Sequence, residues 1–229
     1  MKFLGTLLVI GCAALLPAAG RTQSTATPYP TMAPIDQYRM TPAAEIALAK
    51  SAAPEAISAA ADVLVLGTAG YETEFKGTNG FVCLVARSWD NDFGKPDFWN
   101  PKNRAPICYN PAAARSVLPT YLTKTTWALA GMSQAKMAER SPQASGVQAP
   151  EVGAMCYMMS PSGYLGDDVK GPWHPHLMFF LPRTPAAAWG ADLQHSPVVL
   201  LSAPSAGLTV FLVPVSRWAD GSPDSTRRE

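Results

Sequence analysis

The segment Gly171-Pro172-Trp173-His174-Pro175-His176-Leu177-Met178-Phe179-Phe180-Leu181 carries two of the three histidines of the chain and leads into its most apolar strand pattern. An unbroken apolar run bounded by turn residues is typical of a buried strand, so we predict a strand over 176–181. Pro175 has no N–H for a ladder hydrogen bond and therefore suits the entrance of that strand. A similar run over 154–160 predicts its partner, which a long loop joins to it.

Turn residues divide an earlier part of the chain into three more strand patterns. These cover residues 63–66, 71–76 and 81–88, and glycine-containing turns separate them. Asn79-Gly80 is the strongest of the short hairpin signals, because both residues tolerate a positive φ, and it predicts an antiparallel meander. The run 81–85 is apolar on both faces and should be central in the sheet.

Two cap-and-proline signals predict helices that pack against this sheet. Thr41-Pro42 starts a helix that should end before Pro54, and Asn110-Pro111 starts a second one. Weaker helical patterns and a last hairpin pattern follow, over 121–132, 134–140, 198–201 and 208–215. Together these elements predict an α+β fold, a single domain with a mainly antiparallel sheet of about six or seven short strands and a few short helices against it.

The N-terminus has the pattern of a secretory signal peptide. Lys2 is followed by an apolar run to Leu16 and by small residues up to Gly20, so we predict that residues 1–20 are removed. Cys12 lies inside the apolar run rather than just beyond it, which disfavours the alternative of a lipoprotein signal. The rest of the chain is predicted as a flexible Thr/Pro-rich arm, a single folded domain and a disordered polar tail, over 21–40, 41–218 and 219–229.

Charge and hydropathy exclude several classes of partner. Loss of residues 1–20 removes Lys2 alone among the charged residues, so 18 basic and 17 acidic residues become 17 and 17, and the mature net charge is about zero. Nucleic acids and anionic membrane surfaces are bound by clustered positive charge, and neither is expected as a partner. No later stretch has the ~18 uninterrupted apolar residues of a membrane helix, so no transmembrane segment is expected in the mature chain.

Three cysteines remain after the signal peptide, namely Cys83, Cys108 and Cys156. Export would place them in a compartment where disulfides persist. An odd number leaves one disulfide and a free thiol, or a bridge to another chain, and the sequence alone does not choose. We favour a disulfide between Cys83 and Cys108, because these two residues flank one loop-rich excursion.

The two histidines at the strand entrance suggest a metal site. Residues two apart in an extended segment share a face, so His174 and His176 should point the same way. A divalent metal such as zinc, the one cofactor that the sequence suggests, needs a further ligand, which His195, Asp167, Asp168 or the Cys156 thiolate could supply. None of these residues has a diagnostic spacing. The alternative is structural, with both imidazoles hydrogen-bonded to carbonyl groups of the long loop.

A metal-free alternative is a Cys/His hydrolase. Cys156 would be the nucleophile, and His174 or His176 its base, because the two predicted strands of this hairpin would carry them. Cys156 is embedded in an apolar run, however, and such a setting raises the pKa of a thiol and makes it inert.

Tryptophans in predicted loops indicate a different class of function. Trp89, Trp99 and Trp173 fall outside the strand interiors, where aromatic faces can hold an apolar ligand, a cation or a sugar ring. The alternative for each is packing beneath a loop. We therefore predict an exported, periplasmic or secreted domain that binds an envelope or extracellular ligand without catalysis. A hydrolase centred on His174 and His176 and a purely structural envelope protein are the competing hypotheses.

Overall fold

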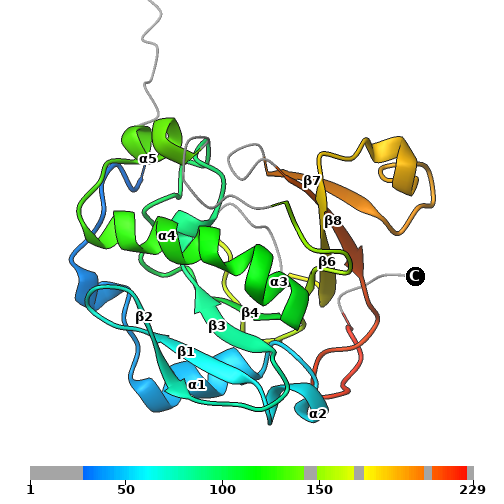
Figure 1. Cartoon of the computed structure of the whole chain (residues 1–229), viewed down its shortest axis with the longest axis horizontal. Helices are drawn as coiled ribbons and strands as arrows, with labels where there is room; N and C mark the ends of the chain where they lie inside the picture. The colour runs from blue at the N-terminus through cyan, green and yellow to red at the C-terminus, as the bar shows by residue number, and fades with distance from the viewer. Residues whose placement is uncertain (1–27, 142–148, 168–172, 204–207, 226–229) are drawn as a thin grey trace, which may run out of the picture.

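The computed structural model describes residues 28–141, 149–167, 173–203 and 208–225. Within these residues an eight-stranded sheet has the order β2-β1-β3-β4-β5-β6-β8-β7 (Figure 1). The strands are β1 Asp62–Leu66, β2 Tyr71–Phe75, β3 Val82–Ala86, β4 Ala105–Tyr109, β5 Met155–Met158, β6 His176–Pro182, β7 Val199–Ala203 and β8 Leu208–Pro214. The predicted α+β class is confirmed.

The sheet is mixed, because β1 and β3 run parallel while the other neighbouring strands are antiparallel. The predicted meander is therefore wrong at its second turn. The Asn79 side chain donates to the Ile57 carbonyl at 2.7 Å and accepts from the Phe81 N–H at 3.0 Å. These bonds make the segment a crossover fixed to the end of α2 (Glu55–Ser58) rather than a two-residue hairpin turn.

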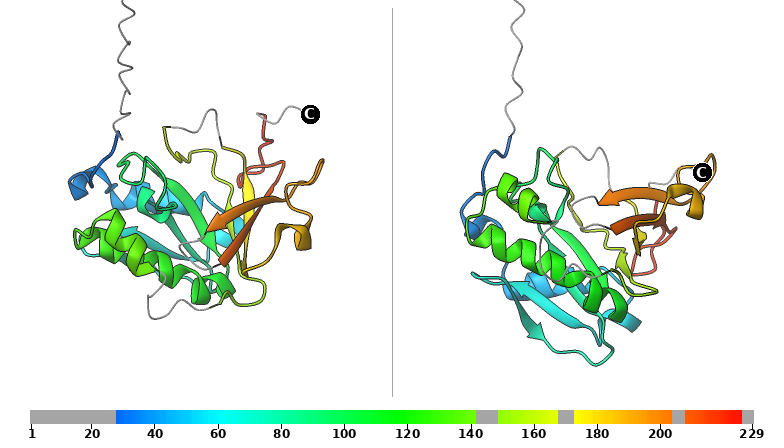
Figure 2. Two further views of the ribbon diagram at one scale, coloured as in Figure 1. Left: turned by 90° about the horizontal axis from the view of Figure 1, so that it is seen from above. Right: turned by 45° about the horizontal axis from the view of Figure 1, so that its top comes forward.

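Helices cover both faces of the part of the sheet formed by β1, β3, β4 and β5 (Figures 1 and 2). On one face α1 packs on β1, β3 and β4, and on the other α3 packs on β4 and β5 while α4 packs on α3. Alternation along β3 serves both layers, since Cys83 and Val85 face α1 while Leu84 faces α3 and α4. The helices not yet given are α1 Pro42–Lys50, α3 Pro111–Ser116, α4 Leu118–Leu129 and α5 Gln134–Arg140, with 3-10 turns η1 Ile35–Gln37, η2 Ser88–Asp90 and η4 Ala186–Trp189.

The two predicted helix starts differ in their caps. The Asn110 side chain accepts from the Ala113 N–H at 2.9 Å with Pro111 in the first turn, as predicted. Thr41 precedes α1, but its hydroxyl makes no capping hydrogen bond. Within the described residues, no helix combines the length and apolar character that a membrane crossing requires.

The predicted disulfide joins Cys83 to Cys108, which lie directly opposite each other on β3 and β4. Both residues are fully buried against α1. Among the described residues Cys156 is the free cysteine, and it is buried on β5. Strand β4, which supplies Cys108, was not predicted, because the sequence pattern assigned the region up to Pro106 to a loop.

Residues near both limits of the described chain are buried where the sequence predicted a flexible arm and a disordered tail. Tyr38, in the predicted flexible arm, is fully buried, and its hydroxyl donates to the Trp99 carbonyl at 2.7 Å. At the other end Asp224 is 8 % exposed and lies within the predicted disordered tail. The folded domain thus includes the described residues 28–40 and 219–225.

A buried ion pair connects the helix layer to the arm. Arg87, which follows β3, donates from Nη2 to Glu45 Oε1 on α1 at 2.8 Å, and both side chains are 0 % exposed. The same guanidinium donates from Nε to the Tyr38 carbonyl at 2.9 Å and from Nη1 to the Val85 carbonyl. Glu45 Oε1 also accepts from the Leu66 N–H at 3.2 Å, whereas Oε2 is buried without a partner. Arg87 therefore ties α1, β3 and the arm together.

Candidate functional site

The two histidines of the β6 entrance have different partners. His174 Nδ1 lies 2.7 Å from Asp224 Oδ2, in the C-terminal segment. His176 Nδ1 lies 2.7 Å from the His174 carbonyl oxygen, and its ring meets Trp173 edge-on at 5.4 Å. Burial lowers the pKa of His176 below its ordinary value. These contacts match the structural alternative, although the partner of His174 is a carboxylate rather than a loop carbonyl.

The proposed metal ligands are not brought together by the described geometry. No three His, Cys, Asp or Glu side chains of residues 28–141, 149–167, 173–203 and 208–225 form a group that could hold a metal ion. His195 lies in the loop between η4 and β7 with a positive φ of 65°. Asp168 lies outside the described residues.

Cys156 is a poor nucleophile in this position. It stands opposite Met178 in the β5–β6 pair, whereas His176 stands opposite Met158, so thiol and imidazole are diagonal neighbours on one face. Burial raises the pKa of the Cys156 thiol well above its ordinary value, which keeps it protonated at neutral pH. The contacts around it are those of an apolar core.

All three tryptophans named from the sequence are buried, and for two of them the contacts are those of packing residues. Trp89 is 0 % exposed and donates from Nε1 to Thr125 Oγ1 at 2.9 Å. Trp173 is 7 % exposed and donates from Nε1 to the Ser160 carbonyl at 2.6 Å. Both indoles are covered, and their N–H groups are hydrogen-bonded inside the protein. The prediction that they contact a ligand is therefore replaced, and we describe them as packing residues.

Trp99 is also largely buried, but it lines a pocket. The pocket has a volume of about 550 Å³ and lies where the N-terminal arm meets the turn between α4 and α5. We call it the arm pocket, and its described lining consists of residues 30–32, Trp99, Ala128 and residues 131–135. Met32 and Met132 contribute flexible apolar side chains beside the indole, and the lining residues carry no formal charge.

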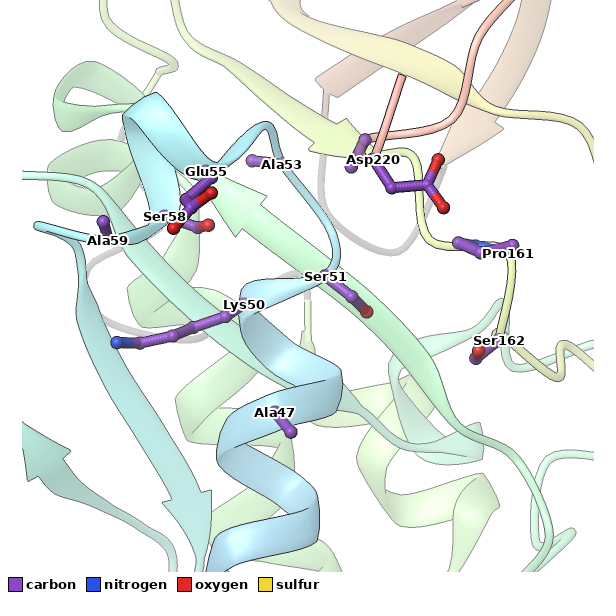
Figure 3. Close-up of a pocket in the computed structure, with 11 residues that line it drawn as sticks. Ala47, Lys50, Ser51, Ala53, Glu55, Ser58, Ala59, Pro161, Ser162 and Asp220 are labelled. Atoms are coloured by element: carbon purple, nitrogen blue, oxygen red, sulfur yellow. The ribbon is translucent and has the colours of Figure 1, made fainter. Parts of the chain in front are cut away.

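A second pocket, of about 510 Å³, lies between the end of α1, α2 and the segments 161–162 and 219–220 (Figure 3). Three of its polar side chains, Lys50, Ser51 and Asp220, already have partners. Lys50 Nζ lies 4.1 Å above the Phe75 ring, and Figure 3 shows this side chain pointing away from Ser162. Asp220 Oδ1 accepts from the N–H and hydroxyl of Ser222 at 2.9 and 2.6 Å. Fewer polar side chains of this pocket are therefore available to bind a ligand than its lining residues suggest.

A buried pair of opposite charges lies beside α4. Lys124 is 4 % exposed, and its Nζ donates to the Asp90 and Asn91 carbonyls at 3.2 and 2.9 Å, beneath the Phe93 ring at 4.6 Å. Burial lowers the pKa of Lys124 to about 8 and raises the pKa of Asp90 to about 6. Perturbed pairs of this kind occur at functional sites and in structural clamps alike. The two carbonyl bonds make Lys124 a clamp on the end of η2.

The raised pKa of Asp90 predicts a distinctive pH dependence. The folded state holds this proton up to about pH 6, whereas an unfolded aspartate releases it near ~4, so its contribution to stability is full below pH ~4 and is lost as the pH rises through 6. We expect the difference in unfolding free energy between wild type and Asp90→Asn to change by up to ~3 kcal/mol over this range. Urea titrations at pH 4, 5, 6 and 7 measure it. Asp92→Asn, on the exposed loop beside it, is the control, and parallel pH curves for wild type and Asp90→Asn would contradict the prediction.

No protein-family model, no curated protein and no solved structure matches this chain. Function is therefore inferred from the geometry of the pockets. Trp99, one of the tryptophans named from the sequence, lines the arm pocket. Sequence reasoning missed Met32 and Met132, because the first lies in a segment predicted to be flexible and the second in an unremarkable helical pattern.

Proposed function

We propose that this chain is an exported, non-catalytic domain that binds a small, uncharged and largely apolar ligand in the arm pocket. The observation that carries the proposal is the pocket of about 550 Å³ lined by Trp99, Met32 and Met132. Pockets for small ligands usually measure ~300–1,000 Å³ and have mostly apolar walls with a few polar groups. Thr31, the Ser133 hydroxyl hydrogen and Gln134 Oε1 would supply those polar groups here, because Ser133 Oγ already accepts from the Lys136 N–H at 3.4 Å and Gln134 Nε2 donates to the Phe93 carbonyl.

The chemistry of the lining supports an uncharged ligand. A charged group that enters an apolar cavity without a partner loses its hydration without compensation. The described lining provides no formal charge to pair with it. The basic side chains of Lys136 and Arg140 lie with Met132 and Glu139 on a separate hollow of about 280 Å³.

Export and the lack of catalysis rest on other features. The N-terminal sequence has the signal-peptide pattern, and the Cys83–Cys108 disulfide is of the kind that persists outside the cytosol. The buried, protonated Cys156 thiol and the internal hydrogen bond of His176 favour binding over a Cys/His hydrolase.

Binding of an uncharged apolar dye tests the proposal. N-phenyl-1-naphthylamine should bind wild-type protein with one-to-one stoichiometry and gain fluorescence. Ala135→Phe, which places a ring at the exposed lining position of α5, should weaken binding at least about tenfold, a loss of ~1.4 kcal/mol. The matched control is Ala130→Phe at the exposed end of α4, outside the lining.

Two results would count against the arm pocket. Equal dye affinity of Ala135→Phe and Ala130→Phe would place binding elsewhere on the protein. No one-to-one binding by wild type, together with no co-purifying small molecule in native mass spectra, would favour the structural envelope protein instead.

A further inference from the structure

The arm that forms one wall of the arm pocket is held at two points of very different strength. The inner point is Tyr38, which is fully buried and bonded through its hydroxyl to the Trp99 carbonyl and through its carbonyl to Arg87. The Tyr38 hydroxyl also accepts from the Ala33 N–H at 3.2 Å. The outer point is Tyr29, and Pro30, Thr31 and Met32 of the pocket wall lie between the two.

The outer point converges on one carboxylate. The Tyr29 hydroxyl donates to Asp167 Oδ2, and the Tyr164 hydroxyl donates to Asp167 Oδ1. Lys102 Nζ lies 3.6 Å from Asp167 Oδ1. These donors hold the pKa of Asp167 below its ordinary value, Tyr164 contributing most and Tyr29 next, so the carboxylate is charged at neutral pH. Asp167 therefore joins the arm to the loop that follows β5.

Few other polar contacts hold this part of the arm. In the described chain upstream of Ala33, the polar contacts that fix the arm to the body converge on the Tyr29 hydroxyl, which donates to Asp167 and also lies beside the Lys102 ammonium group. Pro30 has no N–H to donate, and the side chains of Tyr29 and Met32 are only partly buried against the core cluster. A solvent-exposed hydrogen bond and partial apolar contact open more easily than the buried Tyr38 anchor.

We propose that the Tyr29–Asp167 contact is a latch that closes the arm over the arm pocket. When the latch opens, the segment 29–33 swings away about the Tyr38 anchor, so the Ala33 N–H separates from the Tyr38 hydroxyl and the wall formed by Pro30, Thr31 and Met32 leaves the pocket. The latch thus sets how fast a ligand enters and leaves. This inference rests on the proposed function for its ligand, but the opening of the arm is measured without one.

Amide hydrogen exchange followed by NMR tests the latch directly. Tyr29→Phe and Asp167→Ala should each speed exchange of the Ala33 amide about five- to tenfold, as expected for loss of one hydrogen bond. The Tyr38 amide, bonded to the Ile35 carbonyl at 2.9 Å, should keep its wild-type rate and serves as the internal reference. Tyr164→Phe is the matched control, because it removes a donor from the same carboxylate and leaves the bond to the arm.

Stopped-flow binding of N-phenyl-1-naphthylamine supplies the second readout. The latch is supported if Tyr29→Phe and Asp167→Ala also speed dye association while Tyr164→Phe does not. Unchanged Ala33 exchange in both variants overturns the latch. If the wild-type protein binds the dye, an unchanged association rate in both variants overturns it as well. Faster Ala33 exchange without dye binding by any variant would support the latch and remove the proposed ligand function.

Discussion

Glu45→Ala should lower the free energy of unfolding by roughly 3–5 kcal/mol, one of the two largest effects expected for a single substitution in this protein. The reason is the burial of its partner. Arg87 is 1 % exposed, and its Nη2 donates to Glu45 Oε1 at 2.8 Å, so truncation leaves a buried guanidinium charge without its counter-ion. The Leu66 N–H loses its side-chain acceptor in the same step.

Urea unfolding followed by tryptophan fluorescence measures this loss. Glu55→Ala removes an exposed glutamate from the neighbouring helix α2 and should change stability by less than ~0.5 kcal/mol. Glu45→Gln retains the side-chain shape and a carbonyl acceptor, and it should fall between the two. A loss below ~1 kcal/mol for Glu45→Ala would mean that water reaches Arg87 in solution.

The same substitution should loosen the arm. Arg87 also donates to the Tyr38 carbonyl at 2.9 Å, so a displaced guanidinium weakens the inner anchor. Exchange of the Tyr38 amide should therefore speed up in Glu45→Ala, whereas it should not in Tyr29→Phe. The two variants separate an effect on the inner anchor from an effect on the outer one.

Gly77→Ala is the other substitution expected to have a large effect, of about 3 kcal/mol or more. A Cβ atom at this position would lie 2.1 Å from the Ala60 carbonyl oxygen and 2.4 Å from the Ala61 carbonyl carbon. Both are backbone atoms that cannot rotate away. The crossover between β2 and β3 would have to move, although its Thr78 N–H is bonded to that same Ala60 oxygen at 2.8 Å.

Gly70→Ala is the matched control, because it precedes the same strand β2 and its added Cβ would meet no atom within 4 Å. It should leave stability within ~0.5 kcal/mol of wild type. Thermal and urea unfolding of the two variants side by side give the comparison. Similar losses for both would show that backbone flexibility, rather than the contact with Ala60, decides the effect.

Elements defined by local chemistry were predictable from the sequence, and those defined by distant contacts were not. The Asn110 cap, the β5–β6 pair and the last hairpin follow from neighbouring residues. The parallel pairing of β1 with β3 depends on the Ile57 carbonyl, more than 20 residues before the turn, which takes a bond from Asn79. An Asn-Gly pair permits a hairpin turn, but the Asn79 side-chain amide can instead bond to a distant carbonyl, as it does here.

The candidate site, too, depends partly on local sequence and partly on distant contacts. All three tryptophans in predicted loops are buried, but Trp99 lines the arm pocket, whereas Trp89 and Trp173 pack in the core. Whether an indole lines a pocket depends on what docks beside it. For Trp99 the neighbours are the arm and the turn after α4, and neither follows from the composition of its own loop.

The positions of the three cysteines also bear on how the chain reaches its native pairing. Cys108 stands opposite Tyr157 on β5 and Tyr109 stands opposite Cys156, so Cys156 faces away from the disulfide. A slip of one residue between β4 and β5 would bring Cys108 opposite Cys156 and turn every side chain of β5 to the wrong layer. A bridge formed at that moment would make the misalignment covalent. If an external oxidant joins Cys83 and Cys108 before β5 pairs with β4, taking two electrons from their thiols, this trap is removed and the disulfide helps to set the strand register.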